Sequence, residues 1–215
     1  RPSAAELQAE PYFASERVDE WGRVEMPATS SRTCCEEMLA ADPVALGVPD
    51  TKDILEQVEA HLRMKLGTDV EATERNIHFT ILLYTIQSNA YPRFNAALRE
   101  RPPGALFDAW SPFLWHLLRA LRSLPDHACT VYRGVPDPPN LSGYVKSSRI
   151  HWSGFSSTST DPKVAKLFSS GAPGSVVFVL DVHNAKDVQS HSWFGSAEGE
   201  LLLNPNMEFL GAPSP

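Results

Sequence analysis

The sequence lacks the features that mark membrane-spanning and nucleic-acid-binding proteins. None of its apolar runs approaches the ~18 residues that a membrane-spanning helix requires. Its 19 basic residues are outnumbered by 26 acidic ones, and the resulting net charge of −7 disfavours binding to a phosphate backbone. We therefore expect no membrane span and no nucleic-acid partner.

Cysteine is also scarce. The three cysteines are Cys34, Cys35 and Cys129, and because the first two are adjacent, at most one disulfide to the third forms easily. Such usage favours a reducing, cytoplasmic compartment. No CxxC motif or Cys/His cluster has the spacing of a metal site, so we expect no metal. The chain begins at Arg1 rather than Met, which suggests a trimmed N-terminus and leaves a secreted or surface-attached form open.

A chain of 215 residues is long enough for one domain with a substantial core. Apolar periodicity, caps and prolines predict helices over 32–41, 51–66, 73–88, 89–99, 111–124 and 161–169. Apolar and β-branched runs predict strands over 129–135, 150–159, 175–182 and 200–203. Helices followed by strands indicate an α+β domain over 51–210, with a helical half (51–125) and a strand-rich half (126–210). Residues 1–50 are expected to form a partly helical lead-in.

The first segment that could carry chemistry is Arg133-Gly134, near the end of a predicted strand. The planar guanidinium of Arg133 matches the geometry of phosphate. Gly134 has no side chain, so a ligand can approach the backbone closely there. Taken alone, Arg133 could equally be a strand-edge residue that pairs with a carboxylate.

The second segment is a run of five hydroxyl residues at positions 156–160, directly after Phe155. On a strand, Ser157 and Ser159 share one face, and a small hydroxyl there can hold a carboxylate in one rotamer. The alternative is a polar strand end that leads into a helix capped by Asp161.

The third segment places Glu198 and Glu200 at the mouth of an apolar strand, separated by Gly199. In an extended chain this spacing puts both carboxylates on one side. Two like charges so close are unfavourable unless a cation binds near them, although a solvated acidic turn would have the same sequence. Trp193 and Phe194, in the predicted loop before this segment, either anchor that loop or form a docking surface.

In chain order, these segments resemble the motifs of the R-S-E class of mono-ADP-ribosyltransferases, the arginine-specific group that includes animal ecto-enzymes and cholera-toxin-like enzymes. Arg133 is similar to the strand arginine of that family, residues 157–159 to its Ser-Thr-Ser motif, and residues 198–200 to its Glu-x-Glu motif. The helix expected after the Ser-Thr-Ser motif and the apolar run that ends at Pro205 also resemble the family. The similarity covers roughly residues 50–210.

The resemblance implies the ADP-ribosyltransferase fold, in which a helical half packs on a mixed, sandwich-like core of two small sheets. It also implies NAD⁺ as co-substrate without a metal, and a protein with an exposed arginine as acceptor; we expect the enzyme to act as a monomer. The catalytic residues it implies are Arg133, Ser157, Glu198 and Glu200. The residues it implies for binding NAD⁺ are Arg133, Gly134, Phe155, Ser157, Thr158 and Ser159, and those for contacting the target are Trp193, Phe194 and Glu198.

Two other functions fit the same residues. An NAD⁺ glycohydrolase uses water as the acceptor and does not require the carboxylate of Glu198. A catalytically silent module would keep the fold and bind a partner, although intact Arg133, Ser157 and Glu200 argue against loss of activity.

Overall fold

The computed structural model describes residues 6–9, 27–41, 51–86, 88, 90–100, 104–138, 141–171 and 173–211. These residues divide into two compact units. The helical unit contains the described residues within 27–124 together with the short segment His191–Phe194. The strand unit contains the first strand and the described residues within 125–190 and 195–211. Parts of the predicted lead-in lie outside the described residues.

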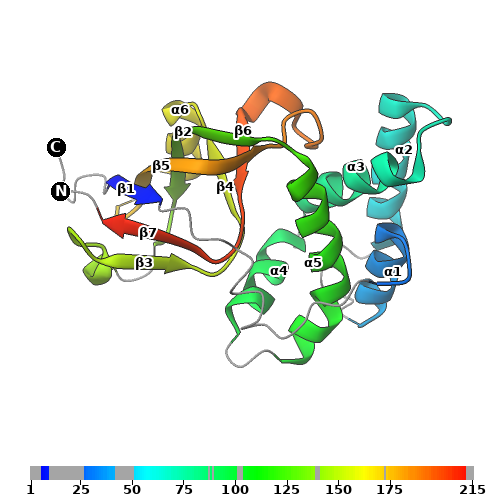
Figure 1. Cartoon of the computed structure of the whole chain (residues 1–215), viewed down its shortest axis with the longest axis horizontal. Helices are drawn as coiled ribbons and strands as arrows, with labels where there is room; N and C mark the ends of the chain where they lie inside the picture. Colours follow the sequence, from blue (N-terminus) through cyan, green and yellow to red (C-terminus); the bar gives the residue numbers. More distant parts are fainter. Residues whose placement is uncertain are drawn as a thin grey trace. The chain divides into compact units, whose positions relative to one another are not determined.

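The helical unit is built around its longest helix, which packs against three neighbouring helices (Figure 1). Its helices are α1 (Ser31–Ala41), α2 (Thr51–Leu66), α3 (Ala72–Thr85), α4 (Ala90–Arg99) and α5 (Ala105–Ser123). Aromatic rings of α4 and α5 meet in its core, where the centroid of Phe94 lies 5.3 Å from Trp110 and 5.5 Å from Phe113. The helix predicted over 51–66 is confirmed with the same bounds, because its apolar residues Ile54, Leu55, Val58 and Leu62 are buried on one face.

The expected start of α5 at Ser111-Pro112 is wrong. The helix begins at Ala105 after the N-cap residue Gly104, so Pro112 lies inside it. Proline has no N–H group to donate to the carbonyl of Asp108 one turn earlier. The hydroxyl of Ser111 donates to that carbonyl at 3.0 Å, which satisfies the acceptor that Pro112 leaves open.

The strand unit contains seven strands and one α-helix among its described residues. Its strands are β1 (Glu6–Ala9), β2 (Asp126–Val135), β3 (Arg149–Trp152), β4 (Ser156–Ser159), β5 (Val176–Asp187), β6 (Glu200–Leu203) and β7 (Met207–Gly211). Its helix is α6 (Pro162–Phe168), and two 3₁₀ turns are η2 (Leu141–Gly143) and η3 (Gly195–Glu198). The predicted cap of α6 is confirmed, since the side chain of Asp161 accepts from the N–H of Lys163 at 2.8 Å.

The strands pair in a larger and a smaller set (Figure 1). In the larger set, β5 runs antiparallel to β2 and parallel to β1, and β7 lies antiparallel between β1 and β3. The smaller set is the antiparallel pair of β4 and β6. One residue pair joins it to β2 (Tyr132 with Ser159), and pairs at Lys186 and Asp187 join β6 to β5, so the strand order is β2-β4-β6-β5-β1-β7-β3. The α+β class with mixed strands is confirmed.

Two expectations for the strands are wrong. The single strand predicted over 150–159 is two strands, β3 and β4, which belong to the two different sets. The break falls at residues 153–155, where Gly154 and Phe155 turn inward and are buried. The strand predicted over 175–182 continues to Asp187, because its later residues pair with β2 and β6.

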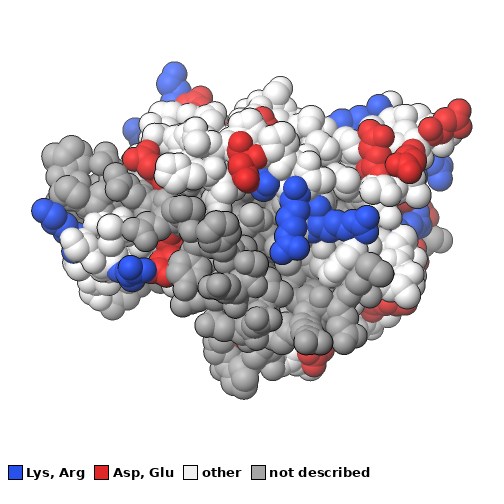
Figure 2. Space-filling view, viewed as in Figure 1, with Lys and Arg blue, Asp and Glu red and all other residues white. Residues whose placement is uncertain are grey.

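The described surface and thiols add three observations. On the face drawn in Figure 2, acidic and basic side chains form small separate groups within a mostly uncharged described surface. All three cysteines are free thiols, and Cys34 and Cys35 are buried. No helix in the described part of the chain combines the length and the apolar character needed to cross a membrane.

Candidate active site

The acidic residue at the start of β6 lies inside the strand unit. Glu200 is only 6% exposed. In the antiparallel register of β4 and β6, Glu200 stands opposite Ser159, and Leu202 stands opposite Ser157. Directly opposed residues point to the same face of a sheet, as do alternate residues of one strand. The register therefore places Glu200 on the face that carries the hydroxyls of Ser157 and Ser159, as expected from the sequence.

The three hydroxyls of β4 have different surroundings. Thr158 donates to the carbonyl of Leu201 at 2.7 Å. Ser159 donates to the carbonyl of Glu198 at 2.7 Å and accepts from the N–H of Asp161 at 3.0 Å. These bonds fix the segment that carries both glutamates and start the turn into α6. The half-buried Ser157 has no hydrogen-bond partner for its hydroxyl among the described residues, so this group is the one left for a ligand or carboxylate.

The predicted phosphate-binding arginine lies on β2 and is connected to the same strand. One terminal nitrogen (Nη1) of Arg133 donates to the carbonyl of Ser157 at 2.8 Å. The central carbon of its guanidinium lies 5.8 Å from the ring centroid of Trp152, within the range of a cation–π contact. Arg133 is thus held beside the Ser-Thr-Ser segment. Phe155, at the start of that segment, is buried at 1% exposure.

Gly134 has a structural role that the sequence did not reveal. A Cβ atom at this position would overlap the carbonyl of Ala165 and lie 2.6 Å from the backbone nitrogen of Ser169. The backbone of α6 therefore occupies the space that a side chain would need. The close approach at Gly134, predicted for a ligand, is made by α6 instead.

The expected extended geometry of the Glu-x-Glu segment is wrong. Glu198 ends the 3₁₀ turn η3, and Gly199 has a φ of +52°, a left-handed conformation that glycine adopts without strain. Nevertheless the carboxylates interact. Burial raises the pKa of Glu198 above its ordinary value, and the negative charge of Glu200 raises this pKa further. The turn, rather than strand alternation, brings the two acidic groups into electrostatic contact.

The two aromatic residues before this turn belong to the helical unit. Trp193 is half-buried; its N–H donates to the hydroxyl of Thr85 at 3.0 Å, and its ring centroid lies 5.0 Å from that of His61. Phe194 is 38% exposed. The loop is therefore anchored through Trp193, as one of the two alternatives predicted, while Phe194 is exposed to solvent.

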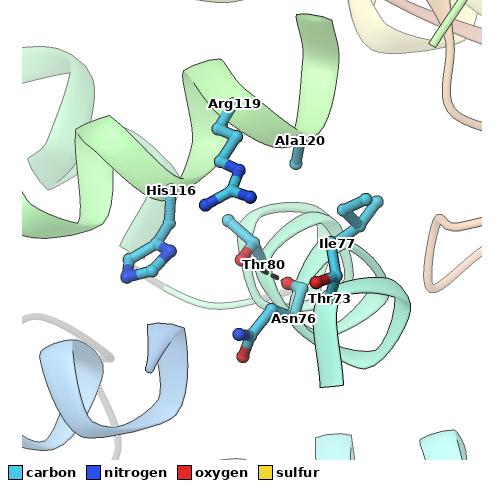
Figure 3. Close-up of a pocket in the computed structure, with 7 residues that line it drawn as sticks. All are labelled: Thr73, Asn76, Ile77, Thr80, His116, Arg119 and Ala120. Carbon is cyan, nitrogen blue, oxygen red and sulfur yellow. Dashed lines mark hydrogen bonds between the residues drawn. The ribbon is translucent and has the colours of Figure 1, made fainter. Parts of the chain in front are cut away.

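A separate small cavity lies between α3 and α5 of the helical unit (Figure 3). Its lining contains none of the predicted site residues and consists of Thr73, Asn76, Ile77, Thr80, His116, Arg119 and Ala120. The sequence signal for it would have been polar residues at helical spacing on both helices. Among the residues that the structure describes, no group of His, Cys, Asp and Glu could hold a metal ion.

Comparison with protein families identifies the chain. The model of the NAD:arginine ADP-ribosyltransferase family matches residues 51–212. The chain belongs to this family. The resemblance to the R-S-E class is thereby confirmed, and this ADP-ribosyltransferase uses NAD⁺ as its co-substrate.

Solved structures of other ADP-ribosyltransferases share the fold. A mutant of the eucaryotic mono-ADP-ribosyltransferase ART2.2, in complex with NADH, has a TM-score of 0.62 at 16% identity, covering 94% of this chain and 85% of that one. HopU1 of Pseudomonas syringae has a TM-score of 0.58 at 20% identity, with coverages of 86% and 92%. The Vis enzyme in complex with agmatine has a TM-score of 0.55 at 23% identity, with coverages of 79% and 83%. Comparison with curated proteins gives no significant match.

Proposed function

We propose that this ADP-ribosyltransferase transfers ADP-ribose from NAD⁺ to arginine side chains of a target protein and releases nicotinamide. The observation that carries the proposal is the pair of carboxylates around Gly199. Glu200 is buried beside the Ser-Thr-Ser strand, and burial together with the charge of Glu200 raises the pKa of Glu198. Each carboxylate has a separate part in the transfer.

Glu200 acts on the donor. Cleavage of the bond between nicotinamide and ribose builds positive charge on the ribose, as in glycoside hydrolysis. A fixed carboxylate stabilises this charge more strongly than mobile water does. Glu200 would also bind a ribose hydroxyl, and Ser157, on the same face of the strand pair, would hold the carboxylate in place.

Glu198 acts on the acceptor. A guanidinium is protonated at neutral pH and is a poor nucleophile. Glu198 would pair with the guanidinium, orient it and assist the loss of its proton during attack. The raised pKa of Glu198 supports this part, because a cationic acceptor offsets both the desolvation of the carboxylate and its repulsion by Glu200.

The remaining residues bind the two substrates. Arg133 would contact the phosphates or ribose of NAD⁺. Phe155 and Thr158 are buried and Gly134 packs on α6, so these residues would support the binding wall from behind, and Ser159 would hold the Glu198 segment. Trp193 and Phe194 would contact the target protein, since Phe194 is exposed and Trp193 is fixed to α3.

The test uses NAD⁺ with agmatine, a small guanidine, and with cadaverine, an amine of similar length that lacks the guanidinium. We expect ADP-ribosyl-agmatine by mass spectrometry and no adduct with cadaverine. Glu198→Gln should lose the adduct about 100-fold and keep release of nicotinamide, because water needs no carboxylate partner. Since the pKa of Glu198 is raised, wild-type transfer should fall on acidification at a pH above the ordinary glutamate value of 4.5, while hydrolysis persists.

The alternatives give different products in the same assay. Free ADP-ribose without any adduct would identify an NAD⁺ glycohydrolase. No release of nicotinamide from the purified chain would identify a silent binding module. Equal loss of transfer and hydrolysis in Glu198→Gln would contradict the separate parts assigned to the two glutamates.

A further inference from the structure

Residues 191–194, here named the acceptor loop, lie in the chain between β5 and β6 but group with the helical unit. We propose that Thr85 and His78 of α3 are positioning residues that hold the acceptor loop in the conformation that receives the arginine-bearing target. The inference rests on the proposed function, because it assigns to two helix residues the selection of the acceptor. It places a determinant of acceptor binding outside the strands that carry Arg133, Ser157 and Glu200.

Thr85 makes the polar connection. Its hydroxyl accepts from the backbone N–H of Trp193 at 3.0 Å and donates to the carbonyl of Ile81 at 2.9 Å. The second bond fixes the direction of the hydroxyl, so its lone pair is presented to the loop. A hydroxyl at the last residue of α3 thus satisfies a loop N–H group that no strand pairs.

His78 makes the stacking connection. Its ring centroid lies 4.1 Å from that of His191, with an angle of 26° between the ring planes. His78 is only 8% exposed, and its Nδ1 atom has no hydrogen-bond partner in the described part of the molecule. Burial lowers the pKa of His78, and Lys65 lowers it further, which favours the neutral ring. The ring surface, rather than that nitrogen, makes the contact with the loop.

The loop has a third contact, made with α2, and a buried serine in its interior. The ring of Trp193 lies against His61 of α2. Ser192 is 1% exposed, and its hydroxyl accepts from the N–H of Phe194 at 3.4 Å. Three of the four loop residues are therefore buried or held, which leaves Phe194 exposed four positions before Glu198.

The chain offers matched variants for the test. Thr85→Val removes the hydroxyl, and Thr85→Ser keeps it. Thr80→Val is the control for a change within α3, because Thr80 donates to the carbonyl of Asn76 in the same manner and forms no hydrogen bond with the loop in the described structure. His78→Ala removes the stacked ring, and His78→Phe keeps a flat ring without the unpartnered nitrogen.

The activity readout uses polyarginine as acceptor. Thr85→Val and His78→Ala should each raise the KM for polyarginine about five-fold, the effect of losing one such contact. Their KM for NAD⁺ and their rate of NAD⁺ hydrolysis without acceptor should stay within about two-fold of wild type, which a general loss of structure would not allow. Thr85→Ser, His78→Phe and Thr80→Val should match wild type.

The second readout needs no activity. Amide hydrogen exchange in a peptide containing residues 191–194 should be about five-fold faster in Thr85→Val and His78→Ala, with unchanged exchange in α5. Unchanged loop exchange would overturn the anchoring. Faster exchange with an unchanged KM for polyarginine would overturn the positioning role. If the wild type modifies no guanidine at all, the proposed function fails, and the exchange result still decides separately whether α3 holds the loop.

Discussion

Each unit of the molecule buries a glutamate, and the two carboxylates have opposite neighbours. In the helical unit, Glu59 is 7% exposed and forms ion pairs with Arg75 and, at 3.2 Å, with Arg32. In the strand unit, Glu200 is 6% exposed and lies near enough to Glu198 to raise the pKa of that carboxyl. Equal burial thus accompanies a cationic environment in one unit and an acidic neighbour in the other.

The different neighbours distinguish a carboxylate with a structural role, Glu59, from one with a proposed catalytic role, Glu200. A buried charge paired with arginines holds helices in register, and removing it leaves cations without their partner. Two carboxylates close together favour the binding of a positive charge beside them. For Glu200 that charge would be the developing oxocarbenium, and for Glu198 the acceptor guanidinium. Four variants test this comparison.

The largest effect is expected for Glu200→Gln. The amide keeps the shape of the side chain but cannot stabilise positive charge, so both transfer and hydrolysis should fall about 10²- to 10³-fold. Release of nicotinamide, followed by chromatography, measures both reactions. Full activity in this variant would remove Glu200 from the mechanism.

Glu59→Gln should show the reverse of Glu200→Gln, with lower stability and unchanged activity. Arg32 and Arg75 lose their shared partner, and the free energy of unfolding should fall by about 3 kcal/mol in urea titrations. Activity per folded molecule should be retained below the unfolding transition. A catalytic loss in this variant without loss of stability would contradict the division between the two glutamates.

Arg133→Ala should weaken NAD⁺ binding about ten-fold by calorimetry, through loss of charge-assisted bonds. Arg133→Lys is the matched control. It keeps the charge but loses the planar guanidinium, so its Kd for NAD⁺ should lie between those of wild type and Arg133→Ala. Near-UV circular dichroism would check that the bond from Arg133 to Ser157 is not needed for folding. An unchanged Kd in Arg133→Ala would exclude a direct contact with NAD⁺.

The smallest effect is expected on the stability of Glu198→Gln. Because folding raises the pKa of Glu198, the folded chain holds this proton more tightly than the unfolded chain does. The ionised carboxylate therefore destabilises the fold at neutral pH, and this penalty disappears as the pH falls below the ordinary glutamate value of 4.5. The variant should be slightly more stable than wild type at pH 7 and equal to it near pH 3.5; lower stability at pH 7 would contradict the sign.

Local sequence rules predicted those elements whose ends depend on local chemistry. Thr51–Leu66 and the cap of α6 at Asp161 follow from apolar spacing, glycine and a capping side chain. The same local rules failed at Pro112, because the hydroxyl of Ser111 donates the hydrogen bond that the proline cannot make and the helix continues through it. Local rules also missed β7. Its pairing with β1 and β3 joins segments far apart in the chain, and no local sequence pattern indicates such pairing.

The residues of the candidate site were predictable to about the same extent as the elements of the fold. Chain order gave the residues of β2, β4 and β6 that the register brings together, since family motifs keep their order in the sequence. It did not give the left-handed turn at Gly199 or the attachment of Trp193 to Thr85. Both depend on contacts between segments, Gly199 with the end of β4 and Trp193 with α3, which sequence spacing does not encode.

The packing of α6 against Gly134 has a consequence for how this gene can vary. Every single-nucleotide change at the first or second position of a glycine codon introduces either a stop or an amino acid with a Cβ atom, and any Cβ here would meet the backbone of Ala165 and Ser169. No single-nucleotide change can therefore replace Gly134 by another residue without a clash with α6. In natural variants of this gene we expect an unchanged glycine there, even where the exposed residues of α6 differ freely.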